Sequence, residues 1–279
     1  MVQLHIDLDT PHILNRFYGG SEECNAPDDE YCQELLQRAG AFFDRCEAKA
    51  TFFIVTSDLQ LTGYAALLKE FARKGHEMAS HTHSHPYFHC KSPVNLMRDE
   101  IKTSYEAIHR HFGRPPSGFR APGFYINDSM ISILRETGYR YDSSSFRAPL
   151  MKLLDLGAQL LGAPTNYSRI PHLGSMPEGI KEFSIPNFFG LPFYNNLNLY
   201  YPRLFQNWLV TLGVRKKCSP YLFHLIEFVE FEKDRKFLPK AIWQHPNLKR
   251  PLKQKLEFAE NLIARFKKEG PVVLARNCA

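Results

Sequence analysis

The chain begins with short apolar runs that alternate with longer stretches of helical spacing. Residues 2–7 have the pattern of a short strand, and residues 50–55 form a continuous apolar run typical of a strand buried on both faces. Between these two runs, residues 31–48 carry apolar side chains three and four positions apart, which predicts a helix. A polar insertion over residues 15–29 precedes that helix.

The same alternation continues along the chain, less regularly in its second half. Further helices are predicted over residues 64–74, 93–112, 150–161, 200–212 and 252–268, and Asp128 is expected to cap one more. Further strands or extended segments are predicted over residues 75–79, 118–120, 139–142, 180–185, 221–228 and 271–275.

Strands that alternate with helices imply parallel strands joined by right-handed crossovers. Seven or eight such units favour an α/β fold in which the strands form a distorted (β/α) barrel. An open, doubly wound sheet is the alternative. Since no linker or repeat divides the chain, residues 1–279 are expected to form one domain.

Polar side chains gather where the predicted strands end. They are Asp7, Asp9, His81, His85, Arg120, Asp142 and His224. In a barrel these strand ends meet on one face. One carboxylate and two imidazoles are the ligand set of a hydrolytic metal site, and a second carboxylate can accept a proton from water. An arginine can orient that carboxylate, and a separate histidine can protonate a leaving group.

Composition narrows the range of partners and compartments. The formal net charge of +6 suits an anionic partner such as a phospholipid surface, but no lysine and arginine block is dense enough to predict nucleic-acid binding. The six cysteines are scattered, which favours reduced thiols, and only Cys24 and Cys32 are candidates for pairing. Because no signal peptide or membrane-spanning run is visible, we expect a cytosolic protein whose membrane contact is at most peripheral, at the inner face.

Five short motifs, in order along the chain, resemble those of the polysaccharide deacetylases, the NodB-homology carbohydrate esterases. They are Asp7-Leu8-Asp9, His81-Thr82-His83-Ser84-His85, Arg120-Ala121-Pro122, Tyr141-Asp142-Ser143-Ser144 and Leu222-Phe223-His224. The fourth motif departs from the family because its usual tryptophan is absent. The resemblance implies the family's barrel fold and metal-dependent removal of an N-acyl group from a sugar.

The resemblance also implies a role for each site residue. Asp9, His81 and His85 would hold one divalent metal, with Asp7 as the catalytic base. Zinc is the first choice for this ligand set, although cobalt, nickel, manganese or iron would also suit it.

Three further roles follow from the later motifs. Arg120 would pair with the base, and the backbone N–H of Gly123 would help to hold the oxyanion. Asp142 would line the substrate groove and buttress Arg120, and His224 would be the catalytic acid.

Within the family, the chain is most similar to the branch that acts on amino sugars linked to polyprenyl phosphate, such as the aminoarabinose lipid deformylases. Residues 6–10, residues 50–53, and Glu227 and Glu230 after His224 carry this similarity. The implied partner is an N-acetyl or N-formyl amino sugar on a lipid. The alternatives are a polysaccharide or nucleotide-linked sugar, a non-sugar amide, and a binding module without activity.

Two groups of residues have more than one interpretation. The first group is an aromatic tract that comprises Phe183, Phe188, Phe189, Phe193, Tyr194, Tyr200, Tyr201, Phe205 and Trp208. This aromatic tract either packs in the core or forms an exposed apolar surface beside a lipid tail. Basic residues that would favour anionic lipid head groups lie near it in the sequence: Arg203, Arg215, Lys216 and Lys217. Strand alternation is expected to turn the ring of His83 away from the metal. No site role is expected for His5, His12, His89, His109 or His111.

Overall fold

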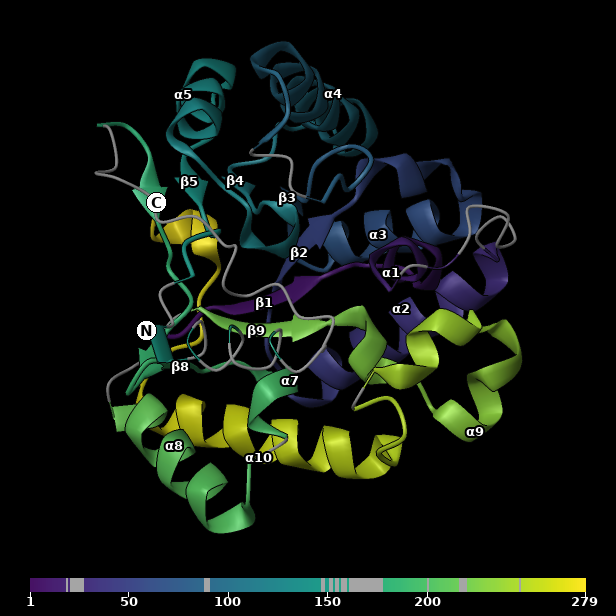
Figure 1. Ribbon diagram of the computed structural model, residues 1–279, viewed down its shortest axis with the longest axis vertical. Coiled ribbons are helices and arrows are strands. Elements are labelled where there is room, and N and C mark those ends of the chain that lie inside the picture. Colours follow the sequence, from purple (N-terminus) through teal and green to yellow (C-terminus); the bar gives the residue numbers. More distant parts are fainter. Residues whose placement is uncertain are drawn as a thin grey trace.

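A sheet of seven parallel strands forms the centre of the molecule (Figure 1). The computed structural model describes residues 1–18, 20, 28–87, 91–146, 149, 150, 153, 156, 160, 178–199, 201–215, 220–245 and 247–279. The strands are β1 (Leu4–Asp7), β2 (Thr51–Ile54), β3 (Glu77–Ser80), β4 (Gly118–Phe119), β5 (Tyr141–Asp142), β6 (Lys181–Glu182) and β9 (Tyr221–His224). Their order is β6-β5-β4-β3-β2-β1-β9, and every neighbouring pair is parallel. The predicted α/β fold with seven parallel strands is confirmed.

Helices connect these strands and cover the sheet. The longer ones are α2 (Asp29–Arg45), α3 (Thr62–Arg73), α4 (Val94–Phe112), α5 (Asp128–Thr137), α8 (Arg203–Arg215) and α10 (Leu252–Glu269), each within a few residues of its predicted position. Shorter ones are α1 (Pro11–Phe17), α7 (Asn195–Asn198) and α9 (Phe231–Asp234), and β7 (Asn187–Phe188) pairs with β8 (Leu191–Pro192) in a separate hairpin. Figure 1 shows α8 and α10 side by side, beyond β9.

Three local predictions need correction, and a fourth lies mostly outside the described residues. Helix α1 occupies the start of the predicted polar insertion, because Pro11 fits the first turn of a helix. Asn127, not Asp128, caps α5, since its side chain accepts the N–H of Met130. The predicted strand 271–275 is reduced to one bridge between Val2 and Val272. Most of the predicted helix 150–161 lies outside the described residues.

The strand predicted over residues 221–228 ends early, at His224. Residues Leu225–Phe228 form the short 3-10 helix η5 instead. This change of direction brings the Glu227 carboxylate back to the backbone N–H of His224, at 2.9 Å. Because β9 ends at His224, the Glu227 carboxylate lies beside His224, whereas in a continuous strand it would lie further along the chain.

The carboxyl ends of the strands lie in register. Asp7 of β1 is opposite His224 of β9, and Ser80 of β3 is opposite Phe119 of β4. The residues that follow, His81 and Arg120, consequently leave the sheet side by side. The sheet thus brings residues far apart in sequence to one edge, as the predicted fold requires.

Close packing between β4 and β5 depends on Gly118, the first residue of β4. A Cβ atom at this position would overlap the ring of Tyr141, which is fully buried and donates its hydroxyl to Glu77 at 3.0 Å. We expect Gly118→Ala to lower the free energy of unfolding by about 1–3 kcal/mol, because the ring has no free space to enter. Urea denaturation measures this loss. Gly270→Ala, where a Cβ would contact nothing, is the matched control, and an equal effect of both would contradict the argument.

The aromatic tract divides between the two interpretations. Phe183, Phe188, Phe193 and Tyr194 are buried, whereas Tyr201 and Phe205 are half-buried and Tyr200 lies outside the described residues. Phe189 and Trp208 are 71% and 43% exposed and stack on each other, with ring centroids 5.4 Å apart. Leu204, also on α8, is exposed as well. Part of the tract is therefore core and part is surface.

Two further observations concern the cysteines and the predicted absence of a membrane-spanning segment. Of the described cysteines, Cys32, Cys46 and Cys278 are free, while Cys24, Cys90 and Cys218 lie outside the described residues. Among the described helices, none combines the length and the apolar character needed to cross a bilayer.

Candidate active site

Three of the predicted ligands meet at the carboxyl end of the sheet. Asp9 follows β1, and His81 and His85 follow β3. Asp9 Oδ1 lies 3.4 Å from His81 Nε2 and 3.1 Å from His85 Nε2. One ligand atom from each residue lies within 4.8 Å of the other two, and all three side chains are buried. This is the spacing at which three donors can share one cation.

Hydrogen bonds orient the three groups toward one cation. His81 Nδ1 donates to the carbonyl oxygen of Arg120, 2.8 Å away, so Nε2 is the atom that faces Asp9. Burial alone would lower the pKa of His81, but Asp7 and Asp9 outweigh it and raise the pKa, so a bound cation would take the place of a proton on Nε2. Burial alone would raise the pKa of Asp9, but the two imidazoles hold it well below its usual range. Burial lowers the pKa of His85, and the ring stays neutral. Asp9 Oδ1 and His85 Nε2 have no hydrogen-bond partner among the described residues, so a cation would satisfy two buried orphan atoms.

The loop that carries the histidines is strained and clamped. Thr82 and His85 have φ angles of 67° and 58°, a left-handed conformation that costs a non-glycine residue free energy. Glu100 of α4 accepts the backbone N–H groups of His83 and Ser84, at 3.0 and 2.9 Å. The Thr82 hydroxyl also accepts the N–H of His85 at 3.1 Å. These bonds stabilise the conformation that directs both ligands inward.

A buried ion pair lies beside the ligands. Arg120 Nη1 donates to Asp7 Oδ1 at 2.6 Å, and neither side chain has more than 4% of its surface exposed. The other oxygen, Asp7 Oδ2, lies 4.0 Å from His81 Nε2 and 4.0 Å from His224 Nε2. Asp7 therefore turns one oxygen to the guanidinium and the other to the space between the ligands and His224.

Arg120 is held from every side. Its Nε donates to the carbonyl of Ser143 at 2.8 Å, and its Nη2 donates to Ser143 Oγ and His5 Nδ1, each at 2.7 Å. The guanidinium also lies 4.1 Å from the ring centroid of Phe53. Since His5 accepts from Arg120, its ring is neutral, and burial and Arg120 both lower its pKa. His5, for which no site role was expected, is thus a buried group that helps to hold Arg120. Its position two residues before Asp7, on the same strand face, was the signal that could have found it.

His224 lies opposite Asp7 and is the most accessible of these groups, with 19% of its side chain exposed. Its Nδ1 is 3.4 Å from Glu227 Oε1. Burial alone would lower the pKa of His224, but Glu227 and Asp7 outweigh it and raise the pKa. Glu227 is itself buried and also accepts the side-chain amide of Asn195. His224 is therefore placed where a proton donor would be, and its raised pKa favours that role.

Asp142 lies behind the site instead of lining it. Its side chain has no exposed surface, and its two oxygens accept the N–H and hydroxyl of Ser144, at 3.0 and 2.6 Å. Ser144 Oγ in turn accepts the N–H of Ala121 at 2.8 Å. A direct contact with substrate does not fit this burial, whereas the buttressing of the Arg120 segment does.

Gly123, in the short helix η3 (Pro122–Phe124), has a φ of 59°, which a glycine adopts without strain.

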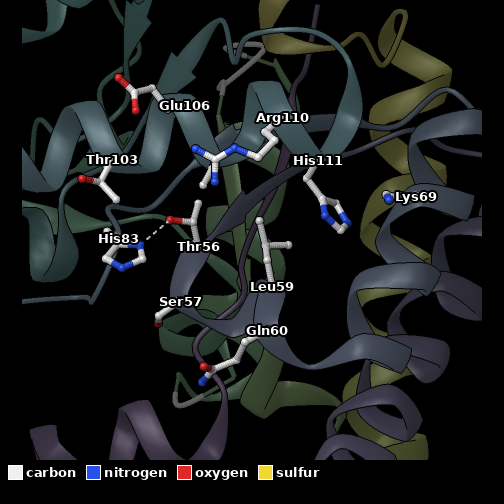
Figure 2. Close-up of a pocket in the computed structure, with 11 residues that line it drawn as sticks. Thr56, Ser57, Leu59, Gln60, Lys69, His83, Thr103, Glu106, Arg110 and His111 are labelled. Carbon is white, nitrogen blue, oxygen red and sulfur yellow. Dashed lines mark hydrogen bonds between the residues drawn. The ribbon is translucent and has the colours of Figure 1, made fainter.

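His83 is not part of the cluster that Asp9, His81 and His85 form. Its Nδ1 lies 3.0 Å from the Thr56 hydroxyl, and its ring lines a separate cavity of about 450 Å³ (Figure 2). Neither Asp7, Asp9 nor His224 lines that cavity. Of the other histidines without an expected role, His89 lies outside the described residues.

Comparison with known proteins finds a family model that matches part of the chain. The polysaccharide deacetylase family model matches residues 27–141, which include His81, His85, Arg120 and Gly123. A peptidoglycan-N-acetylglucosamine deacetylase of Bacillus cereus is 30% identical over 116 residues, which cover 42% of this chain and 51% of that protein. The chain thus spans about half the length of this curated relative. Asp7, Asp9 and His224 lie outside the region matched by the family model, so their place in the site rests on geometry.

Solved structures share the fold of the whole described chain. A Mycobacterium smegmatis protein assigned as a polysaccharide deacetylase has a TM-score of 0.60 at 15% identity, over 99% of this chain and 87% of that one. The allantoinase PuuE has a TM-score of 0.56 at 14% identity, over the same shares of the two chains. At such identities the likeness concerns the fold alone. Residues 27–141 therefore carry the sequence pattern of the polysaccharide deacetylases, and the described chain has the fold of that family.

Proposed function

We propose that the chain is a metal-dependent hydrolase that removes an N-acyl group from an amino sugar. The observation that carries the proposal is the convergence of two sets of groups. Asp9, His81 and His85 come within 4.8 Å of one another, and Asp7 Oδ2 lies between His81 and His224 at 4.0 Å from each. Ligands, base and acid are thus within reach of one substrate amide.

The donor set fits a divalent cation held by Asp9, His81 and His85. When bound, such a cation supplies Lewis-acid polarisation of the acyl carbonyl and lowers the pKa of water. Zinc is the first choice for one carboxylate and two imidazoles, and cobalt, nickel, manganese and iron also suit them.

The remaining groups divide the proton transfers between them. Asp7, oriented by Arg120, accepts a proton from a water molecule while the oxygen of that water forms a bond to the acyl carbon. The backbone N–H of Gly123 stabilises the oxyanion that forms. His224 then donates a proton to the nitrogen as the C–N bond breaks, which releases the free amino sugar and the carboxylic acid. Asp142 acts indirectly, through Ser144 and the Arg120 segment.

We extend the proposal to the whole chain. Strands β1 and β9 come from opposite ends of the sequence, yet they are neighbours in the sheet and supply Asp7 and His224. Residues 1–279 would therefore act as one catalytic domain.

The substrate that we favour is an amino sugar linked to polyprenyl phosphate. The motif residues that resemble that branch support it, and so does the exposed apolar surface formed by Phe189, Leu204 and Trp208. Arg203 lies on α8, as do Leu204 and Trp208, and its charge would attract anionic head groups in a peripheral contact with the membrane. Of the other basic residues considered, Lys216 and Lys217 lie outside the described residues.

The test is direct. Metal-loaded protein is incubated with N-acetyl and N-formyl amino sugars, free and polyprenyl-linked, and released acetate or formate is measured with and without a chelator. We expect release that the chelator abolishes and added metal restores, and faster release from the lipid-linked form. Hydrolysis of allantoin but of no sugar would contradict the sugar substrate. Release that is unaffected by the chelator would contradict the metal.

A change at Glu227 tests the assignment of the acid. Because Glu227 helps to raise the pKa of His224, Glu227→Gln should move the alkaline limb of the kcat–pH profile to lower pH. A general acid works only while protonated, so activity is lost as pH rises through its pKa. We also expect kcat at the optimum to fall by about 10–100-fold. The exposed Glu230, changed to Gln, is the matched control and should leave the profile unchanged.

A further inference from the structure

Two carboxyl groups lie on neighbouring strands behind Arg120. Asp142 of β5 and Glu182 of β6 are opposite each other in parallel register, so their side chains leave the same face of the sheet. Asp142 has no exposed surface. Glu182 Oε2 is buried as well, and no N–H or O–H group of the described residues donates to it. A buried acceptor without a donor costs the folded state free energy, so this oxygen calls for an explanation.

Three buried serines, Ser143–Ser145, follow β5 directly and connect the carboxyl groups to Arg120. Asp142 accepts the N–H and the hydroxyl of the middle serine. Glu182 Oε1 accepts the N–H of the last serine at 3.0 Å. The first serine accepts two hydrogen bonds from Arg120, through its carbonyl oxygen and its hydroxyl. The two carboxyl groups thus hold one end of this serine segment, and the guanidinium is bonded to the other.

Burial decides the protonation of the two carboxyl groups. Two carboxylates side by side in a buried site repel each other, so one of them keeps a proton at neutral pH. Burial and the charge of Asp142 raise the pKa of Glu182 far above its usual range, and burial also raises the pKa of Asp142. A proton on Glu182 Oε2, donated to Asp142, removes the repulsion and satisfies the buried oxygen at once.

The cations nearby do not replace this proton. Arg120 lowers the pKa of both carboxyl groups, but less than burial raises them, and its guanidinium pairs with Asp7. Lys181 precedes Glu182 on β6 and therefore points to the opposite face of the sheet. Its Nζ donates there to the carbonyl oxygen of Cys278.

We propose that Glu182 is a positioning residue of the active site, which keeps a proton and donates it in a hydrogen bond to Asp142. The carboxyl pair then fixes the serine segment and, through it, the guanidinium of Arg120 that orients Asp7. The shared proton takes no part in the reaction. The effect of Glu182 on catalysis rests on the proposed function, whereas the shared proton can be measured without any substrate.

Urea denaturation of the wild type and of Glu182→Gln, at about pH 5.5, 7 and 8.5, tests the shared proton. An unfolded chain releases the glutamate proton above a pKa of about 4.3, whereas the folded wild type keeps it and so loses stability as pH rises between the two pKa values. Glutamine donates an N–H to Asp142 and has no proton to lose. We therefore expect the unfolding equilibrium constant of the wild type, divided by that of the variant, to rise by up to about tenfold for each pH unit.

The matched control is Glu178→Gln, a change of an exposed glutamate four residues earlier in the chain. Its ratio to the wild type should stay constant over the same pH range, because that carboxyl group is in contact with solvent in both states. A constant ratio for Glu182→Gln would show that the two carboxyl groups share no proton. An equal rise in the control would overturn the assignment to Glu182.

The positioning role is tested with Glu182→Met, which fills a similar volume but neither donates to Asp142 nor accepts from the serine segment. We expect kcat to fall by about tenfold or more with KM little changed, and Glu182→Gln to recover most of that loss. A wild-type kcat in Glu182→Met, or an equal fall in both variants, would overturn the positioning role. Inactivity of the wild type toward every amide would contradict the proposed function alone, since the unfolding measurements need no substrate.

Discussion

Replacing Asp7 by asparagine is expected to lower kcat by about 10²–10⁴-fold, with the metal content unchanged. Asparagine has nearly the same shape and can still accept the hydrogen bond that Arg120 donates to Asp7 at 2.6 Å. It cannot accept a proton from water. Since Asp7 is not among the three clustered ligands, Asp7→Asn separates the loss of the base from the loss of the cation.

Steady-state kinetics and metal analysis of the purified variant check this expectation. Asp9→Asn is the matched control, because it replaces the neighbouring carboxylate that lies 3.1 Å from His85 Nε2. That control should lose metal as well as activity. Activity near the wild-type level in Asp7→Asn, or a loss of metal from it, would show that Asp7 is not the base.

The second large effect concerns stability. Arg120→Met should lower the free energy of unfolding by about 3–5 kcal/mol, because it leaves a buried carboxylate without its counter-charge. Arg120 has no exposed surface, and it also donates to Ser143 and His5. Methionine fills much of the same volume, so the loss reflects the uncompensated Asp7 and the freed acceptors more than a cavity.

Urea denaturation measures the loss, and a double-mutant cycle assigns its cause. The combination Arg120→Met/Asp7→Asn should regain part of the stability, since no charge is then left unpaired. Arg45→Met is the control, as Arg45 pairs with Glu260 at an exposed site and should cost about 1 kcal/mol or less. If Arg120→Met cost no more than that control, the ion pair would not be a support of the site.

The order of elements was largely predictable from the sequence, because apolar periodicity reflects local burial. Strands β1 and β2 and helix α10 lie where their patterns indicated. The end of β9 was not predictable in this way. Residues 225–228 are apolar enough for a strand, but the contact of Glu227 with His224 turns the chain into η5. The contact is a local capping box, but His224 stands where the usual box has serine or threonine, so the sequence pattern did not reveal it.

The candidate site was predictable to the extent that its residues end strands. Asp7, Asp9, His81, His85, Arg120 and His224 do meet, because parallel strands place their carboxyl ends at one edge. The sequence did not assign His5, and it placed Asp142 only in part. No role was expected for His5, yet it accepts a hydrogen bond from Arg120. Asp142 was expected to line the groove and to buttress Arg120, and it lies fully buried, where only the second role fits. Both outcomes depend on which face of a strand a neighbouring side chain occupies.

The tension in the histidine loop has an evolutionary consequence. A left-handed β-branched residue such as Thr82 holds its conformation only while its anchors resist relaxation, and the Glu100 carboxylate on α4 is the chief anchor among the described residues. Mutations at Glu100 would let the loop relax to a less strained backbone conformation and would move the imidazoles of His81 and His85 apart. If the proposed metal site is right, selection could adjust how firmly a cation is held there through Glu100, a residue that is not one of its ligands.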